Sequence, residues 1–191
     1  MTTTTRHPAE AIRPRRERPS KGRKLCGVKP YAFVVFLIGI CSHATVATAQ
    51  TLLDFNGEDR WNMNRVIEAA ATRLARGSCQ KVLFDFVDEQ DVPLGTRLAS
   101  TARNPVEAFA ALRFVNRPLA PQCRTGNRLA FTFPGSQVIY VCSLKLRNES
   151  IQNSVRTELI LIHEFLHSLG LGENPPTSQA ITEQVVVRCG G

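Results

Sequence analysis

Histidine is scarce in this chain of 191 residues: two of its four histidines stand before residue 50, and only His163 and His167 follow. None of the six cysteines forms a Cys-x-x-Cys pair, which argues against a zinc site built from thiolates. No methionine occurs after Met63. The longest apolar run falls short of the about 20 residues that a membrane-spanning helix needs. These absences argue against a cysteine zinc cluster and a transmembrane protein.

Positive charge is concentrated at the N-terminus. Residues 1–30 carry nine of the 24 lysines and arginines and two of the 16 acidic residues, which leaves 15 basic and 14 acidic side chains beyond residue 49. A net charge of +8 spread over the whole chain would suggest binding to nucleic acid. Because the remainder is nearly neutral, we predict no nucleic-acid partner.

The first 49 residues have the order of a secretory signal peptide: a basic region, the apolar run YAFVVFLIGIC and the small residues of Ala-Thr-Ala. We expect cleavage after Ala49 and a secreted or periplasmic protein. We expect no stable membrane association after cleavage, because the apolar run is too short to cross a bilayer. Lipidation at Cys41 is an alternative, disfavoured because a large residue precedes this cysteine.

Residues 50–191 are expected to form one domain, which contains four cysteines. An even number of cysteines in a small exported domain favours two disulfides, for which three connectivities exist. We favour Cys123–Cys142, whose cysteines flank an expected hairpin, and Cys79–Cys189, which would hold the C-terminus in place.

The apolar periodicity predicts a small α+β domain with a short mixed sheet and one long buried helix. Helices are predicted over 64–78, 104–115 and 153–169, with a terminal helix that begins after Thr177 or Ser178. Strands are predicted over 81–87, 128–133 and 137–146, and loops over 88–103, 116–127 and 147–152.

The segment HEFLH (163–167) lies in the strongest helical pattern of the chain. His163 and His167 are four residues apart, so on a helix they project from one face and can bind one zinc ion at about 2.0–2.1 Å each. Glu164 can then reach a zinc-bound water and accept its proton as a general base. The surrounding helix is apolar nearly all round, and burying these three side chains costs several kcal/mol unless a metal compensates. We therefore predict Zn²⁺ as a cofactor; histidines satisfied by hydrogen bonds within a core are the alternative.

The third zinc ligand cannot be a histidine of this domain. Gly170 allows the chain to reverse after the helix, and the three residues to Glu173 span up to about 10 Å, enough to reach back to the metal. We favour Glu173 as the ligand. Glu183, in the expected terminal helix, is one alternative, and a different ligand or none is another. The simpler interpretation of Glu173 is a solvated loop carboxylate.

The stretch HEFLHSLGLGE resembles the metzincin zinc-peptidase pattern, HExxHxxGxx followed by His or Asp. His163, Glu164, His167 and Gly170 match this pattern, and Glu173 takes the third-ligand position as a glutamate. The resemblance implies a zincin-like domain over residues 50–191, with the motif on an active-site helix. The metzincin methionine turn has no counterpart, because no methionine follows the motif, so the chain would be a divergent member.

The resemblance further implies hydrolysis of peptide bonds, with the substrate lying along the strand VIYVCSL. We expect an exported, monomeric zinc peptidase that acts on a protein or peptide. The alternatives are a catalytically inactive, zinc-stabilised binding or structural protein and a zinc amidohydrolase that acts on a small amide or ester. Tyr140 is a candidate donor to an oxyanion, and Asp85 and Asp88 are candidates for binding calcium or supporting a ligand histidine. An ordinary strand tyrosine and solvated carboxylates are the simpler interpretations of these three residues.

Overall fold

The computed structural model describes residues 51–191; the expected leader, its cleavage site and Cys41 lie outside this part of the chain. Its elements are, in chain order, β1 (Thr51–Leu53), α1 (Gly57–Leu74), α2 (Gly77–Gln80), α3 (Val82–Asp85), α4 (Leu94–Ala99), α5 (Pro105–Ala110), β2 (Arg113–Asn116), α6 (Pro121–Arg124), β3 (Ala130–Phe131), β4 (Val138–Val141), α7 (Ser143–Gln152), α8 (Ser154–Ser168) and α9 (Ser178–Cys189). No helix within residues 51–191 combines the length and apolarity that crossing a membrane requires.

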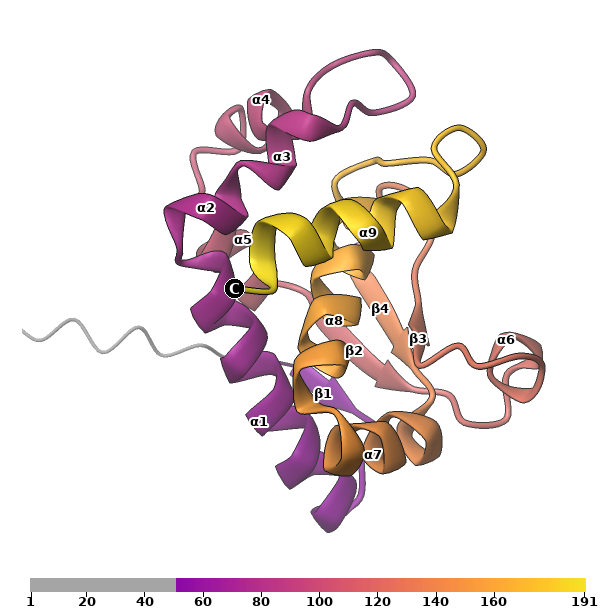
Figure 1. The fold of residues 1–191 in the computed structure, drawn as a ribbon. Helices are drawn as coiled ribbons and strands as arrows, with labels where there is room; N and C mark the ends of the chain where they lie inside the picture. The colour runs from indigo at the N-terminus through magenta and orange to yellow at the C-terminus, as the bar shows by residue number, and fades with distance from the viewer. Residues whose placement is uncertain (1–50) are drawn as a thin grey trace, which may run out of the picture. The chain divides into compact units, whose positions relative to one another are not determined.

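A four-stranded sheet has the order β1-β2-β4-β3 (Figure 1). β1, β2 and β4 run parallel, whereas β3 pairs antiparallel with β4 through Ala130 opposite Val141. The domain is therefore α+β with a short mixed sheet, as expected. β4 has a strand on each side, whereas β3 is an edge strand.

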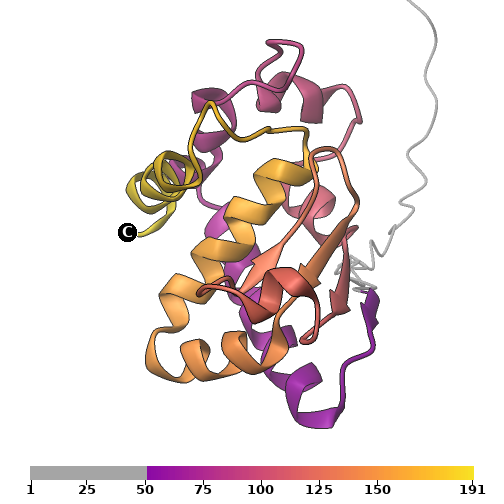
Figure 2. The ribbon, with the colours of Figure 1, turned by 90° about the vertical axis from the view of Figure 1, so that its right-hand side faces the viewer.

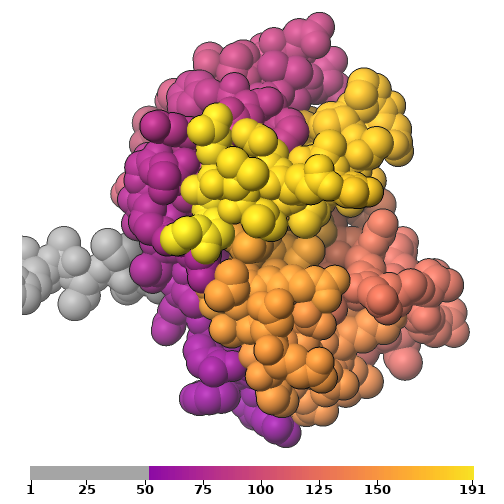
Figure 3. Space-filling model, viewed as in Figure 1, coloured from indigo at the N-terminus to yellow at the C-terminus, as the bar shows by residue number. Residues whose placement is uncertain are grey.

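The helix α8 packs on one face of the sheet, in contact with α1, α7 and α9 (Figures 1 and 2). Phe165 of α8 meets Phe109 edge to face at 5.6 Å, and Phe109 meets Phe114 of β2 at 5.7 Å in the same manner. Eleven of the fifteen residues of α8 are buried, so the expectation of a helix buried nearly all round is confirmed. In the space-filling view, α9 lies over the C-terminal half of α8, the half that carries HEFLH (Figure 3).

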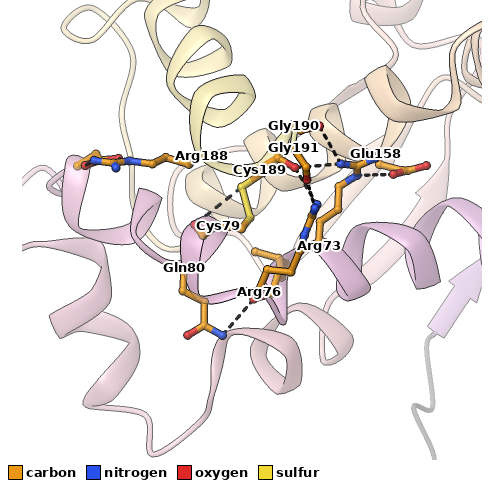
Figure 4. Close-up of a disulfide and its surroundings, with 11 residues drawn as sticks. Arg73, Arg76, Cys79, Gln80, Glu158, Arg188, Cys189, Gly190 and Gly191 are labelled. Atoms are coloured by element: carbon orange, nitrogen blue, oxygen red, sulfur yellow. Dashed lines mark hydrogen bonds and ion pairs between the residues drawn. A yellow bond between two sulfur atoms is a disulfide. The ribbon is translucent and has the colours of Figure 1, made fainter.

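The C-terminal end of α9 is held against α1 and α2. The disulfide Cys79–Cys189 joins α2 to α9, and Cys123–Cys142 is the second disulfide; both pairings match the expectation. Arg73 Nη1 and Arg76 Nη2 donate to the Cys189 carbonyl at 2.9 and 2.8 Å (Figure 4). The chain-entropy model assigns about 5 kcal/mol to closing a loop of this length, so the covalent link and the two arginines fix α9 across α8.

Two expected elements are wrong in type. Residues 81–87 were expected to form a strand but contain the helix α3, because Val82 and Leu83 are buried where α2, α4 and α9 surround them, and none of the strands within residues 51–191 pairs with this segment. The expected strand over 137–146 ends at Val141, and the rest of it joins the expected loop 147–152 in α7. The helix forms because Leu146 and Ser150, four residues apart, both face the interior.

Other expected elements are present but begin or end at different residues than predicted. The helix expected over 104–115 begins at the Asn104–Glu107 capping box but ends at Ala110, because the following residues are required in the central strand β2. The first helix begins at Gly57 rather than residue 64, with Asn56 accepting a hydrogen bond from the Asp59 N–H. The expected loop 88–103 contains α4. α8 lies within one residue of its expected limits, and Thr177 caps α9.

Candidate metal centre

α8 presents two buried imidazoles to the same point. The Nε2 atoms of His163 and His167 are 3.0 Å apart, and both residues are 4 % exposed. Glu173 Oε1 lies 3.3 Å from His167 Nε2 and 3.9 Å from His163 Nε2. Tetrahedral ligands at about 2.0–2.1 Å from zinc lie about 3.3–3.4 Å from one another. The spacing of the three atoms therefore fits one metal ion of this size.

Glu173 reaches the histidines because the chain reverses directly after α8. Gly170 has a φ of +104°, a conformation that L side chains rarely adopt, and its N–H donates to the His167 carbonyl at 2.9 Å. The Glu173 side chain is 34 % exposed, so one side of the group faces solvent. Glu183, in contrast, is exposed on α9 and accepts a hydrogen bond from Gln179 Nε2 at 2.8 Å. Of the two carboxylates considered, the fold brings Glu173 to the histidines.

The other ring nitrogen of each histidine is held by a hydrogen-bond acceptor. His167 Nδ1 lies 2.7 Å from the carbonyl oxygen of Leu171, which can only accept. His163 Nδ1 lies 3.0 Å from Thr182 Oγ1, and that hydroxyl already donates to the Ser178 carbonyl. Each Nδ1 therefore carries a proton, and in the neutral form of the imidazole this leaves Nε2 as a lone-pair acceptor.

When both imidazoles are neutral, two Nε2 lone pairs face each other at 3.0 Å with a carboxylate oxygen beside them, and they repel one another unless a metal ion or a proton lies between them. The simpler interpretation, two histidines satisfied by hydrogen bonds in a core, accounts for the Nδ1 atoms, and it accounts for the Nε2 atoms only if one of them carries a second proton that it donates to the other. The donor set of two imidazoles and one carboxylate is one that zinc uses in sites that keep a fourth position open.

The buried carboxyl group of Glu164 stands next to this group of ligands and is 7 % exposed. Burial raises the pKa of Glu164 to about 8, although the charge of Arg128 and the backbone N–H of Thr132 act in the opposite direction. Burial also lowers the pKa of His163 to about 3, and the charges of His167 and Arg128 contribute to this shift. At neutral pH His163 is therefore uncharged, the form that binds metal, and a cation beside Glu164 would favour its ionised form.

Two cavities adjoin at the ligands. The larger has a volume of about 620 Å³ and the smaller about 270 Å³, and both are lined by Arg128, His163, Glu164 and Ser178. Residues of the edge strand β3 and of the segment before it line both cavities. A ligand longer than a single small group can therefore extend to either side of Glu164.

The remaining candidate residues lie elsewhere. Tyr140 stacks on Phe131 with ring centroids 5.0 Å apart, packs beside the Cys123–Cys142 disulfide and lines neither cavity. β4 lies between β2 and β3, so the expectation of a substrate along VIYVCSL is wrong; of the two edge strands, β1 and β3, it is β3 whose residues line the cavities. The reason is that Ala130 and Phe131 occupy the outer edge of β4, a pairing that local sequence does not reveal.

Asp85 and Asp88 bind arginines rather than supporting a histidine. The Asp85 carboxylate accepts from Arg188 at 2.7 Å, which links α3 to α9, and its pKa is held below the ordinary value by this hydrogen bond. Asp88 pairs with Arg97 and is buried, so the expectation of a solvated carboxylate is wrong at this position. An added Cβ at Gly170 would lie 3.3 Å from the Asp88 Cβ, so Asp88 packs against the turn that leads to Glu173.

Three groups at the site were not anticipated from the sequence: the Thr182 hydroxyl, the Leu171 carbonyl and the Arg128 side chain. Thr182 and Leu171 contact histidines of α8, and no local sequence pattern predicts these contacts. Arg128 is the first residue of the predicted strand 128–133, and only its position at the start of an edge strand could have drawn attention to it.

Comparisons with models of known protein families, with curated proteins and with solved structures found no match to this chain.

Proposed function

We propose that the protein is a zinc-dependent peptidase in which His163, His167 and Glu173 hold the metal. The observation that supports this most directly is the arrangement of three acceptor atoms, Nε2, Nε2 and Oε1, around one point, with both Nδ1 protons already engaged. A purely structural zinc site is usually closed by four protein ligands. The three ligands here, with the buried base Glu164 beside them, favour a site that also accepts a substrate.

A zinc ion bound at these ligands would act as a Lewis acid and lower the pKa of a nearby water molecule. The carboxylate of Glu164 would accept a proton from the attacking water and later deliver it to the nitrogen of the departing amine. The Leu171 carbonyl and the Thr182 hydroxyl would keep both imidazoles in the orientation and tautomer that present Nε2. In this proposal the three ligands bind the metal, Leu171 and Thr182 orient the imidazoles, and Glu164 transfers the proton.

The edge strand β3 supports a peptide as substrate. Its outer edge has no strand partner among the described residues, so its backbone groups can pair with an extended chain. The two adjoining cavities provide space to either side of Glu164 for the flanking side chains. A small amide would need only one of them.

Export is part of the proposal. Two disulfides in a domain of this size favour an oxidising compartment such as the periplasm or the extracellular space. We further propose that the protein acts as a monomer on protein or peptide substrates.

The first test measures zinc in the purified protein by elemental mass spectrometry, with Glu173→Ala and Glu183→Ala as a matched pair. We expect about one zinc per chain in the parent and in Glu183→Ala, and a clear loss in Glu173→Ala, because only Glu173 reaches the histidines. An absence of zinc from the supplemented parent would overturn the proposal. Zinc retained by Glu173→Ala would remove Glu173 from the ligands.

The second arm measures cleavage of a mixture of internally quenched peptides by the parent and by Glu164→Gln. We expect the variant to retain zinc and to lose between about 10²- and 10⁴-fold in rate, the range for a general base. A parent that binds zinc but cleaves no peptide would instead favour a zinc-stabilised binding protein.

A further inference from the structure

Arg128 is an exposed arginine at the junction of the two cavities. Its side chain makes no hydrogen bond or ion pair with another residue in the described range 51–191. Some arginines elsewhere in the domain are engaged, such as Arg97 with Asp88, Arg117 with Asp54 and Arg188 with Asp85. Others, such as Arg124, also lack a side-chain partner within residues 51–191 but line neither cavity. The guanidinium of Arg128 is therefore available to a ligand in either cavity.

The larger cavity is positively charged apart from Glu164. Arg128 and Arg156 are its cationic lining residues, and Glu164 is its one acidic lining residue; the other side chains that line it are uncharged or histidine. Arg156 is partly neutralised by Glu149 at 2.8 Å. If Glu164 and the metal engage the reacting group, the charge of Arg128 stays uncompensated unless the ligand brings an anion.

The backbone around Arg128 is anchored on both sides. Lys145 Nζ donates to the Gly126 carbonyl at 2.6 Å, and Cys142 N–H donates to the Leu129 carbonyl at 2.9 Å. The Cys123–Cys142 disulfide connects the preceding helix α6 to the end of β4. Arg128 therefore projects from a supported segment at the start of the edge strand, beside the His163 and Glu164 side chains with which it shares both cavities.

We propose that Arg128 binds a carboxylate of the substrate, so that the preferred peptides carry a negative charge within one or two residues of the scissile bond. This specificity rests on the proposed peptidase function. The planar guanidinium can pair with a carboxylate through two parallel hydrogen bonds, which an uncharged amide cannot reproduce. The carboxylate is either the side chain of Asp or Glu or the C-terminus of the peptide.

The test combines binding and cleavage measurements, so that a failure of the Arg128 specificity proposal can be distinguished from a failure of the peptidase proposal. Binding is measured by fluorescence anisotropy on zinc-loaded Glu164→Gln protein, with labelled peptides that differ only in Glu or Gln and in a free or amidated C-terminus. We expect the carboxylate-bearing peptides to bind about 10- to 100-fold more tightly, the range for hydrogen bonds to a charged group. Adding Arg128→Met should remove this preference, and Arg128→Lys should restore part of it.

Arg124→Met is the matched control, because Arg124 is an exposed arginine four residues earlier that lines neither cavity. It should keep the full preference. A preference for Glu in amidated peptides assigns the side-chain carboxylate, and a preference for the free C-terminus assigns the terminal one; both support the proposal. Equal binding of charged and uncharged peptides, or a preference that survives Arg128→Met, would overturn it.

Cleavage of the same peptides by proteins with an intact Glu164 gives the second readout. A parent that cleaves all of them with equal kcat/KM would refute the specificity while leaving the peptidase proposal intact. A parent that cleaves none, together with an Arg128-dependent preference in binding, would refute the peptidase proposal and retain Arg128 as a carboxylate-binding residue.

Discussion

Thr182 is the point at which α9 contacts the candidate metal centre, and it offers a sharp test of how the site is built. Replacing Thr182 with valine keeps the shape and the β-branch of the side chain but removes the oxygen that accepts the His163 Nδ1 proton at 3.0 Å. The imidazole then loses the contact that fixes its tautomer and orientation. We expect weaker zinc binding with little change in fold.

The magnitude follows from the surroundings of the hydrogen bond. Loss of a supporting partner to a metal-bound histidine lowers metal affinity by about 10- to 100-fold, or about 1.4 to 2.8 kcal/mol. His163 is 4 % exposed, which makes an unpaired Nδ1 proton costly, but Thr182 is half-buried and lines the larger cavity. Water can therefore replace part of the lost contact, and we expect a loss near about 10-fold.

The assay is a zinc titration in competition with a chromophoric chelator. Thr182→Ser keeps the hydroxyl and should bind zinc nearly as tightly as the parent. Thr125→Val is the matched control, because Thr125 also lines the larger cavity but donates to the Pro121 carbonyl at 3.0 Å rather than contacting a histidine. Parent-like affinity in Thr182→Val, or an equal loss in Thr125→Val, would show that the Thr182 hydroxyl does not support His163 in zinc binding.

Two further predictions concern the protein without metal and the turn after α8. Between pH 6.5 and about 8 the folded state keeps a proton on Glu164 that the unfolded chain has already released. The free energy of unfolding of chelator-treated protein should therefore fall as pH rises through this range, by up to about 2 kcal/mol. His163 has the opposite effect on stability, but only below its ordinary pKa of 6.5. Urea unfolding of Glu164→Gln should show no fall in the free energy of unfolding over this pH range. The same fall in the parent and in Glu164→Gln would exclude Glu164 as its source. Gly170→Ala should cost about 1–3 kcal/mol and weaken zinc binding, because it places a Cβ at a φ of +104° and 3.3 Å from the Asp88 Cβ. Gly57→Ala, with no atom within 4 Å of the added Cβ, should melt close to the parent, and equal losses in both variants would contradict the strain argument.

The features of this fold that can be predicted from sequence are those that depend on neighbouring residues. His163 and His167 are four residues apart, so they lie on one face of any helix. The apolar residues around them require that helix to be buried. The capping box at Asn104 and the cap at Thr177 mark helix starts through hydrogen bonds that span three residues. The reversal at Gly170 follows from the φ freedom of glycine.

Other features depend on contacts between segments far apart in the chain, which neighbouring residues do not specify. The segment 81–87 has β-rich composition, yet it is helical because α2, α4 and α9, rather than strands, surround it. The choice of Glu173 over Glu183 depends on which side of α9 faces α8, and that side presents Thr182. The positions of Thr182 and Arg128 at the site follow from packing between segments far apart in the chain, held by the two disulfides. Helix geometry fixes distances within one turn, whereas the docking of α9 and β3 on α8 is a property of the whole core.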